Sequence, residues 1–211
     1  MKIVQVQKLG GVSLILGSML LLIYSIVFSV VMPVDHIRTD YAIVVLHPCW
    51  IPLAWSALVA VLLMLFGFTA VYSKIITEAG VAGLLGFIFI ELAYLLQACN
   101  ITWEIFIWPV IASHRDSVFL LRDLVFKNDP LMGIFKMSAS MTILLGIVLF
   151  CFALVRSTIF PKSGGILIFI GALLYGLGPL FSVMVAIIGI FLLSVGCSII
   201  GIRLIKKSAV G

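Results

Sequence analysis

Long apolar runs separated by short polar segments dominate the chain. Residues 9–32 carry no charge and end before Pro33, and residues 50–72 form a second uncharged run. A helix needs about 20 apolar residues to cross the roughly 30 Å of a bilayer's hydrocarbon core. Each of these two runs therefore predicts a transmembrane helix.

The third apolar run, residues 79–112, is longer than one span requires. As a single helix it would reach about 50 Å at about 1.5 Å per residue. Either the helix projects beyond the membrane, or it ends near Cys99 and the chain continues along the interface, with a break at Pro109. We place the span at 79–99 and assign residues 100–130, where charged and apolar side chains mix, to an interfacial segment.

The remaining apolar stretches predict three further spans. Residues 137–155 form the fourth, and residues 164–202 contain no charge and are too long for one helix. A turn at Gly178-Pro179 divides this stretch into spans at 164–180 and 183–203. The fold class predicted is an all-α membrane protein, a bundle of six transmembrane helices in a single domain, 1–211.

A weak internal repeat favours three tandem helical hairpins within that bundle. The glycines of the first span, Gly10, Gly11 and Gly17, recur at a constant offset as Gly164, Gly165 and Gly171. A second offset aligns residues 68–80 with residues 152–164. Repeated helix pairs are a common way to build membrane proteins.

Composition and charge support the membrane assignment and exclude nucleic acid as a partner. The chain is 64% hydrophobic and 10% charged, whereas a soluble domain has about 25% charged residues. Its net charge is +5, but the bases lie at the ends of apolar runs, where they fit anionic headgroups. With both termini on one side, that side has eight Lys and Arg residues, against five on the other: Arg38, Arg115, Arg122, Lys127 and Lys136. This bias predicts cytoplasmic N- and C-termini.

The third run contains the polar residues that best suggest a function: Glu91, Gln97, Asn100 and Glu104. An acid at the centre of a membrane helix costs about 2.5–3.5 kcal/mol on insertion scales, so Glu91 requires an explanation. The other three follow i, i+3, i+7 spacing and share one helix face, with Glu91 about a third of a turn away. They could line an outward-facing polar cavity, or form interhelical hydrogen bonds.

Other reactive residues do not suggest a metal site, a cofactor or a catalytic group. His36, His47 and His114 lack HxxxH or HxxE spacing, and no histidine lies within a span to ligate haem. The four cysteines lack CxxC spacing, although Cys49 and Cys99 both lie at helix ends and could pair. The chain has no P-loop, GxGxxG or GxSxG signature. We therefore predict no metal and no cofactor, and favour a non-enzymatic protein.

Several short motifs occur in the order found in a known group. They are His47-Pro48 with Trp50, Phe66-Gly67-Phe68 with Val71-Tyr72, Glu104 with Pro109 and Ala112, and Pro161 with Gly164-Gly165. In these, residues 45–207 resemble uncharacterised bacterial multi-pass membrane proteins of the DUF4386-like kind. The resemblance implies an integral protein of the bacterial inner membrane and no particular activity.

Three functional hypotheses follow. The leading one is a binding or transport module for a small solute or ion, in which Glu91 binds a cation or exchanges a proton and the amides of Gln97 and Asn100 position the ligand. The second is a non-catalytic accessory subunit that packs against a larger membrane complex. The third is an intramembrane enzyme acting on a lipid or quinone, with Glu91 or Glu104 as acid or base. The expected partners are the lipid bilayer and either a small ligand or a membrane protein.

Overall fold

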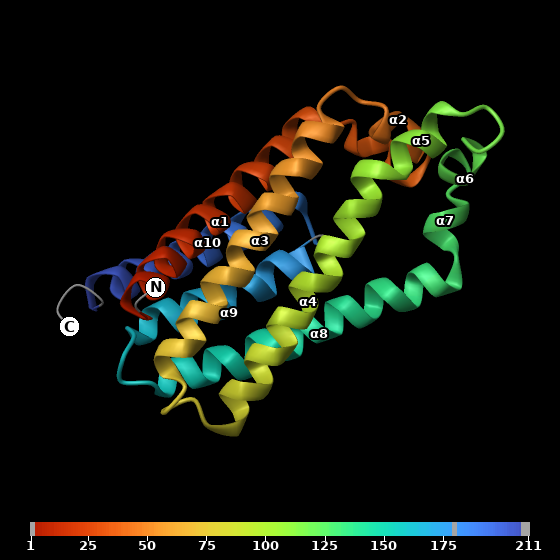
Figure 1. Cartoon of the computed structure of the whole chain (residues 1–211). Helices are drawn as coiled ribbons and strands as arrows, with labels where there is room; N and C mark the ends of the chain where they lie inside the picture. The colour runs from red at the N-terminus through yellow and green to blue at the C-terminus, as the bar shows by residue number, and fades with distance from the viewer. Residues whose placement is uncertain (1–2, 179–180, 208–211) are drawn as a thin grey trace.

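The structure, a computed structural model, describes residues 3–178 and 181–207, and within these ranges every regular element is helical (Figure 1). The long helices are α1 (Ile3–Val31), α3 (Trp50–Ile75), α4 (Gly80–Phe106), α8 (Pro130–Arg156), α9 (Lys162–Leu177) and α10 (Val183–Lys207). Five short helices lie between them in the chain: η1 (Val34–Arg38), α2 (Tyr41–Val45), α5 (Trp108–Ser113), α6 (Phe119–Arg122) and α7 (Val125–Asn128). The protein is all-α in its described residues, as predicted.

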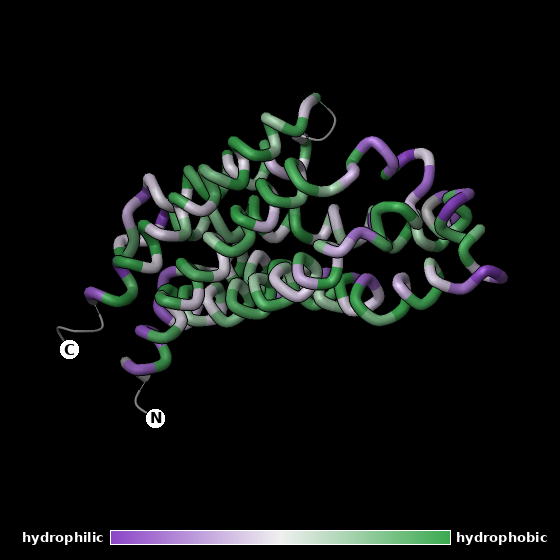
Figure 2. The backbone as a smooth tube through the Cα atoms, turned by 90° about the horizontal axis from the view of Figure 1, so that it is seen from above, coloured by the Kyte–Doolittle hydropathy of each residue, from purple (hydrophilic) through white to green (hydrophobic). Residues whose placement is uncertain are grey.

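Five of the helices are long and apolar enough to cross a membrane. They cover Gln5–Val31, Trp50–Ile75, Gly80–Ser113, Pro130–Arg156 and Val183–Lys206. The predicted span at 164–180 corresponds to α9, which has 16 residues and is about 24 Å long, less than the hydrocarbon thickness. Hydrophobic residues fill the middle of the bundle and hydrophilic ones gather towards its two ends (Figure 2). Helix length thus accounts for five of the six predicted spans.

The six long helices pack in a ring of neighbours. Consecutive helices form the pairs α1–α3, α4–α8 and α9–α10, which is the arrangement of three helical hairpins. The pairs join because α1 also packs against α10, α3 against α4, and α8 against α9. The beginning of α1 and the end of α10 lie at one end of the bundle, called here the terminal end (Figure 1). The short helices gather at the opposite end, called here the loop end.

Close helix contacts and a packed core fill the terminal half of the ring. Apolar side chains from all six long helices meet there, including Leu14, Phe68, Phe150, Ile168 and Cys197. Between α1 and α10 the hydroxyl of Ser194 also donates to the backbone oxygen of Ser18, at 2.7 Å. This half is therefore a tightly packed scaffold.

A hydrogen-bonded clasp joins two loops at the terminal end. The carboxylate of Glu78, in the α3–α4 connection, accepts from the Ser157 hydroxyl at 2.8 Å and from the backbone N–H and hydroxyl of Thr158 at 2.7 and 2.9 Å. Charge-assisted hydrogen bonds of this kind are the strong ones. The clasp fixes the α3–α4 and α8–α9 connections to each other.

Two boundaries differ most from the predicted ones, by seven residues each. Helix α4 continues past Cys99 to Phe106, so the chain projects onward as a helix where we placed the start of the interfacial segment. Ile101 and Ile105 are buried in those added turns, against Ala54, Ala57 and Val61 of α3. This apolar contact favours continuing the helix. The other boundary is the start of α8, at Pro130 instead of residue 137.

Candidate functional site

The polar residues of α4 continue the face with which this helix packs on α8. Near the terminal end Gly86 lies against Phe150 of α8, and Ile90 lies against Gly146 of α8. Positions seven residues apart lie on nearly the same side of a helix. Asn100 therefore lies on the same line along the helix as Gly86 and Ala93. Gln97 and Glu104 lie on the same line as Ile90. All three polar side chains lie on the α8 side of α4.

Helix α8 leaves the bundle along the same stretch. Its second half is packed in the core, whereas large side chains near its start are exposed, at 76% for Leu131, 63% for Ile134 and 67% for Met137. Figure 1 shows this half of α8 diverging from α4. Helix α8 therefore covers the apolar stretch of this α4 face near the terminal end, but it does not cover the polar stretch in the same way.

Glu104 is held by its own helix and by α3. The Asn100 side-chain amide donates to Oε1 of Glu104 at 2.7 Å, and the Trp50 indole donates to the Glu104 backbone oxygen at 2.9 Å. The carboxyl group lies near enough to Lys136 of α8 to interact electrostatically. In the described part of the chain the direct ion pair found is Arg122–Asp40, so Glu104 and Lys136 do not neutralise each other by contact.

A pocket of about 120 Å³ lies beside these groups, between the start of α8 and the loop-end helices. Its lining combines mainly apolar residues with Tyr41 and Lys136: Ile37, Tyr41, Trp108, Leu120, Leu121, Leu124, Phe126, Met132 and Lys136. We call the pocket together with Asn100 and Glu104 the loop-end site. Most ligand sites have this composition, with mainly apolar walls and few polar groups.

Two aromatic rings, Tyr41 and Trp108, line the pocket, and Trp50 packs against both. Tyr41 meets Trp108 edge-on, with ring centroids 5.2 Å apart, and Trp50 stacks on Trp108 at 6.1 Å. Such arrangements are favourable aromatic contacts. Burial raises the pKa of Tyr41 well above its usual range, and the nearby Glu104 and Tyr24 add to the effect. The Tyr41 hydroxyl therefore keeps its proton at neutral pH.

The four residues singled out in the sequence do not form one cavity. Asn100 and Glu104 contact each other, and Gln97 lies exposed on the same helix face. Glu91 lies on another side of α4, where its Oε1 is 3.2 Å from the Thr69 hydroxyl of α3. The structure thus places Glu91 at a helix–helix seam, outside the loop-end site.

The other candidate ligands stay apart in the described residues. No three His, Cys, Asp or Glu side chains come together there to hold a metal ion. Nδ1 of His47 accepts from the backbone N–H of Cys49 at 3.2 Å, so this histidine shapes the turn before α3. Cys49 and Cys99 are both free thiols and do not form the disulfide considered above.

Comparisons with known proteins add no relative: no family model, no curated protein and no solved structure matches the chain. The resemblance to DUF4386-like proteins stays a prediction.

Three residues of the loop-end site, Tyr41, Trp108 and Lys136, are not among the candidates that the sequence indicates. Lys136 had a signal, because it is the one base in the otherwise apolar residues 130–155. The topology prediction uses Lys136 only as one of the five bases outside the spans on one side of the membrane.

Proposed function

We propose that this protein is a membrane-embedded binding module for a small solute that has an apolar body and an anionic group. The single observation that supports this most is the position of Lys136. Lys136 lines the pocket and interacts electrostatically with the Glu104 carboxyl of a different helix, without a direct ion pair between them. Lys136 is also the one charged residue of α8 before the last residue of that helix, Arg156.

The lining suggests how such a solute binds. Its anionic group pairs with Lys136, and its apolar body lies against Trp108, Leu121 and Phe126. The Tyr41 ring adds to the same wall. Glu104, fixed by Asn100, orients the Lys136 amine and accepts from any donor on the solute. Glu91 has no part in this site.

A thermal-shift screen in detergent micelles tests the proposal. Small carboxylates, zwitterions and organic phosphates are the probes, since a ligand stabilises the state that binds it. We expect at least one to stabilise the wild type with a saturable dose dependence, and to bind at least about tenfold more weakly to Lys136→Met. A tenfold change corresponds to about 1.4 kcal/mol.

Lys162→Met is the matched control, because Lys162 begins α9 at the terminal end, far along the bundle from the pocket. It removes the same charge and leaves the site intact, so the wild-type affinity is expected. If no probe binds, or if every bound probe stabilises Lys136→Met as well as it stabilises the wild type, the proposal is wrong.

The exposed start of α8 favours a second candidate function, an accessory subunit of a larger membrane complex. Leu131, Ile134, Met137 and Met141 are exposed apolar side chains three or four residues apart, so they share one side of this helix. A partner helix could cover them. Purification in mild detergent distinguishes the candidates, because a stable monomer without a co-purifying protein contradicts the accessory role.

A further inference from the structure

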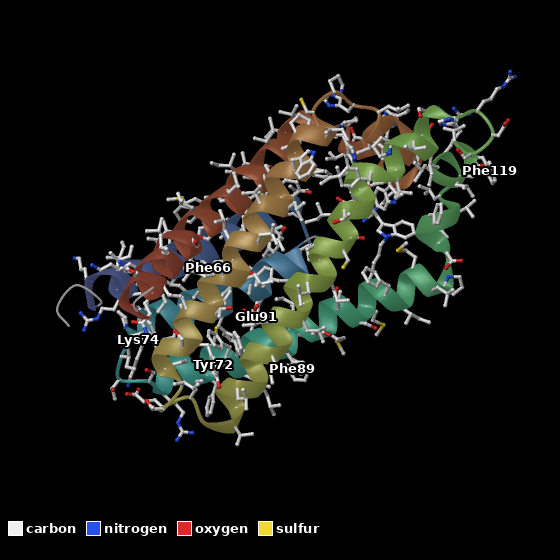
Figure 3. All side chains as sticks on the ribbon, viewed as in Figure 1. Phe66, Tyr72, Lys74, Phe89, Glu91 and Phe119 are labelled. Carbon is white, nitrogen blue, oxygen red and sulfur yellow. The ribbon has the colours of Figure 1, made fainter. Side chains whose placement is uncertain are left out.

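A second polar site lies on the outer surface of the bundle, at the seam between α3 and α4. It consists of Thr69 from α3 and Glu91 from α4, and Figure 3 shows Glu91 beside this seam. Thr69 is exposed and Glu91 is half-buried. Their neighbours along the two helices are exposed apolar side chains, such as Leu62 at 51% and Leu92 at 45%. On a protein in a bilayer, this surface faces lipid.

The hydrogen bonds of Thr69 bear on the protonation of Glu91. Oγ1 of Thr69 lies 2.9 Å from the backbone oxygen of Leu65, four residues earlier, and 3.2 Å from Oε1 of Glu91. A threonine hydroxyl has one hydrogen and two lone pairs. Donation to the carbonyl four residues back is the common arrangement for Thr within a helix. The hydroxyl can donate its one hydrogen either to this carbonyl or to Oε1 of Glu91.

When the hydroxyl donates to the Leu65 carbonyl, its contact with Glu91 needs a hydrogen from the Glu91 carboxyl group. Two oxygens with only lone pairs between them repel, whereas a carboxylic acid O–H can donate to Oγ1 of Thr69. The neutral acid therefore satisfies both contacts of Thr69 at once, whereas a carboxylate would have to take the hydrogen that Thr69 otherwise donates to the Leu65 carbonyl.

The surroundings of Glu91 also favour the neutral form. Glu91 lies 11 residues after the first residue of α4, about 16 Å along the axis at about 1.5 Å per residue, which is deep in the apolar part of the helix. Among the described residues no cation compensates a charge there, and the titratable group that interacts with it is the Tyr94 hydroxyl, one turn onward in α4. On α3 the group in contact is Thr69, and α8 packs on a different face. An isolated carboxylate in such a place is strongly disfavoured.

We propose that Glu91 and Thr69 form a proton-binding site at the lipid-facing α3–α4 seam, in which Glu91 is a neutral acid that donates to Thr69. The site is separate from the loop-end site and needs no solute. Its ligand is the proton, and reagents dissolved in the lipid reach it. The proposal is independent of the proposed function, because neither residue touches the loop-end pocket.

Carbodiimide labelling of the reconstituted protein tests the accessibility and the protonation together. A carboxylic acid adds across one N=C bond of the reagent, its proton going to nitrogen and its oxygen to carbon, and the adduct rearranges to a stable N-acylurea with no leaving group. We expect a lipid-soluble carbodiimide at neutral pH to modify Glu91, identified by peptide mass mapping. A water-soluble carbodiimide should leave Glu91 unmodified. Failure of the lipid-soluble reagent, or labelling by the water-soluble one alone, would overturn the proposal.

Infrared difference spectra provide a second readout that is spectroscopic and needs no reagent. Subtracting the spectrum of Glu91→Gln from that of the wild type should leave the C=O band of a protonated carboxyl group. Thr69→Val, nearly isosteric, should shift this band to higher frequency, since the acid loses its acceptor. Glu104→Gln is the matched control and should leave the band in place. Carboxylate bands at neutral pH in the same difference spectrum would contradict the assignment. Should Glu91→Gln fail to fold, the labelling of the wild type alone decides.

Discussion

The two halves of the α4–α8 pair show how one helix face serves two purposes. In the terminal half, Gly86 of α4 and Gly146 of α8 allow backbone-to-backbone contact with Phe150 and Ile90. In the loop half, the same α4 face carries Gln97, Asn100 and Glu104, and α8 diverges. Lys136 of α8 lines a pocket between the start of α8 and the short loop-end helices. Close packing supplies stability in one half, and its absence leaves room for a ligand in the other.

The difference has a physical basis in the lipid solvent. Apolar helices have no hydrophobic drive to associate in hydrocarbon, so close van der Waals contact between small residues holds them together. Polar side chains of the size of Glu104 and Lys136 prevent such contact and lie near the loop end, where headgroups and water are within reach. We therefore expect mutations in the terminal half to affect stability and those in the loop half to affect binding.

The largest effect is expected from a methyl group added to the packed half. The Cβ atom of Gly146→Ala would lie 2.8 Å from the backbone nitrogen of Ile90, too close for α4 and α8 to stay in place. Overpacking of this kind costs about 1–3 kcal/mol, and we expect the upper end because backbone is in the way. Thermal or denaturant unfolding in detergent measures the loss.

Gly133→Ala is the matched control, on the same helix but in the loop half. No atom lies within 4 Å of a Cβ added there, and alanine is favoured over glycine inside a helix by about 1 kcal/mol. This variant should be as stable as the wild type or more so. Equal destabilisation by the two substitutions would contradict the difference between the halves.

The clasp at the terminal end should give the next largest effect. Glu78→Ala removes three hydrogen bonds and leaves the hydroxyl of Ser157, which is 3% exposed, without its acceptor. A loss of about 2 kcal/mol is expected, since hydrogen bonds to charged groups contribute about 1.5–3 kcal/mol each but part of that is recovered by water. Glu78→Gln keeps one acceptor and should lose less. Solute binding at the loop-end site should be unchanged in both, and weaker binding there would mean that the halves are not separable.

The sequence predicts the long helices well, because hydrocarbon thickness fixes their minimum length. It also predicts correctly that Gln97, Asn100 and Glu104 share a face, since helical spacing alone determines this. The partners of Glu104 and Glu91 could not be predicted, because Lys136 and Thr69 come from helices whose contacts depend on the three-dimensional packing. Apolar runs alone do not predict the start of α8, because Lys136 interrupts the run. Asp129-Pro130, an N-cap residue followed by proline at the first helical position, marks it correctly.

That N-cap gives the smallest expected change in stability and the sharpest test of the loop half. Oδ1 of Asp129 accepts from the backbone N–H groups of Leu131 and Met132 at 2.8 and 3.2 Å. Loss of such a cap costs about 1 kcal/mol. Because the start of α8 is mostly exposed and lacks packing to hold it, Asp129→Ala should fray the first turns while the packed half stays folded. Hydrogen exchange at residues 131–136 should then become faster, and solute affinity should fall because Met132 and Lys136 line the pocket.

Asp129→Asn is the control, because it keeps an acceptor oxygen and should retain both the slow exchange and the solute affinity. Unchanged exchange in Asp129→Ala would mean that the start of α8 is held by contacts other than its cap, and the loop half would then be as firmly fixed as the terminal half.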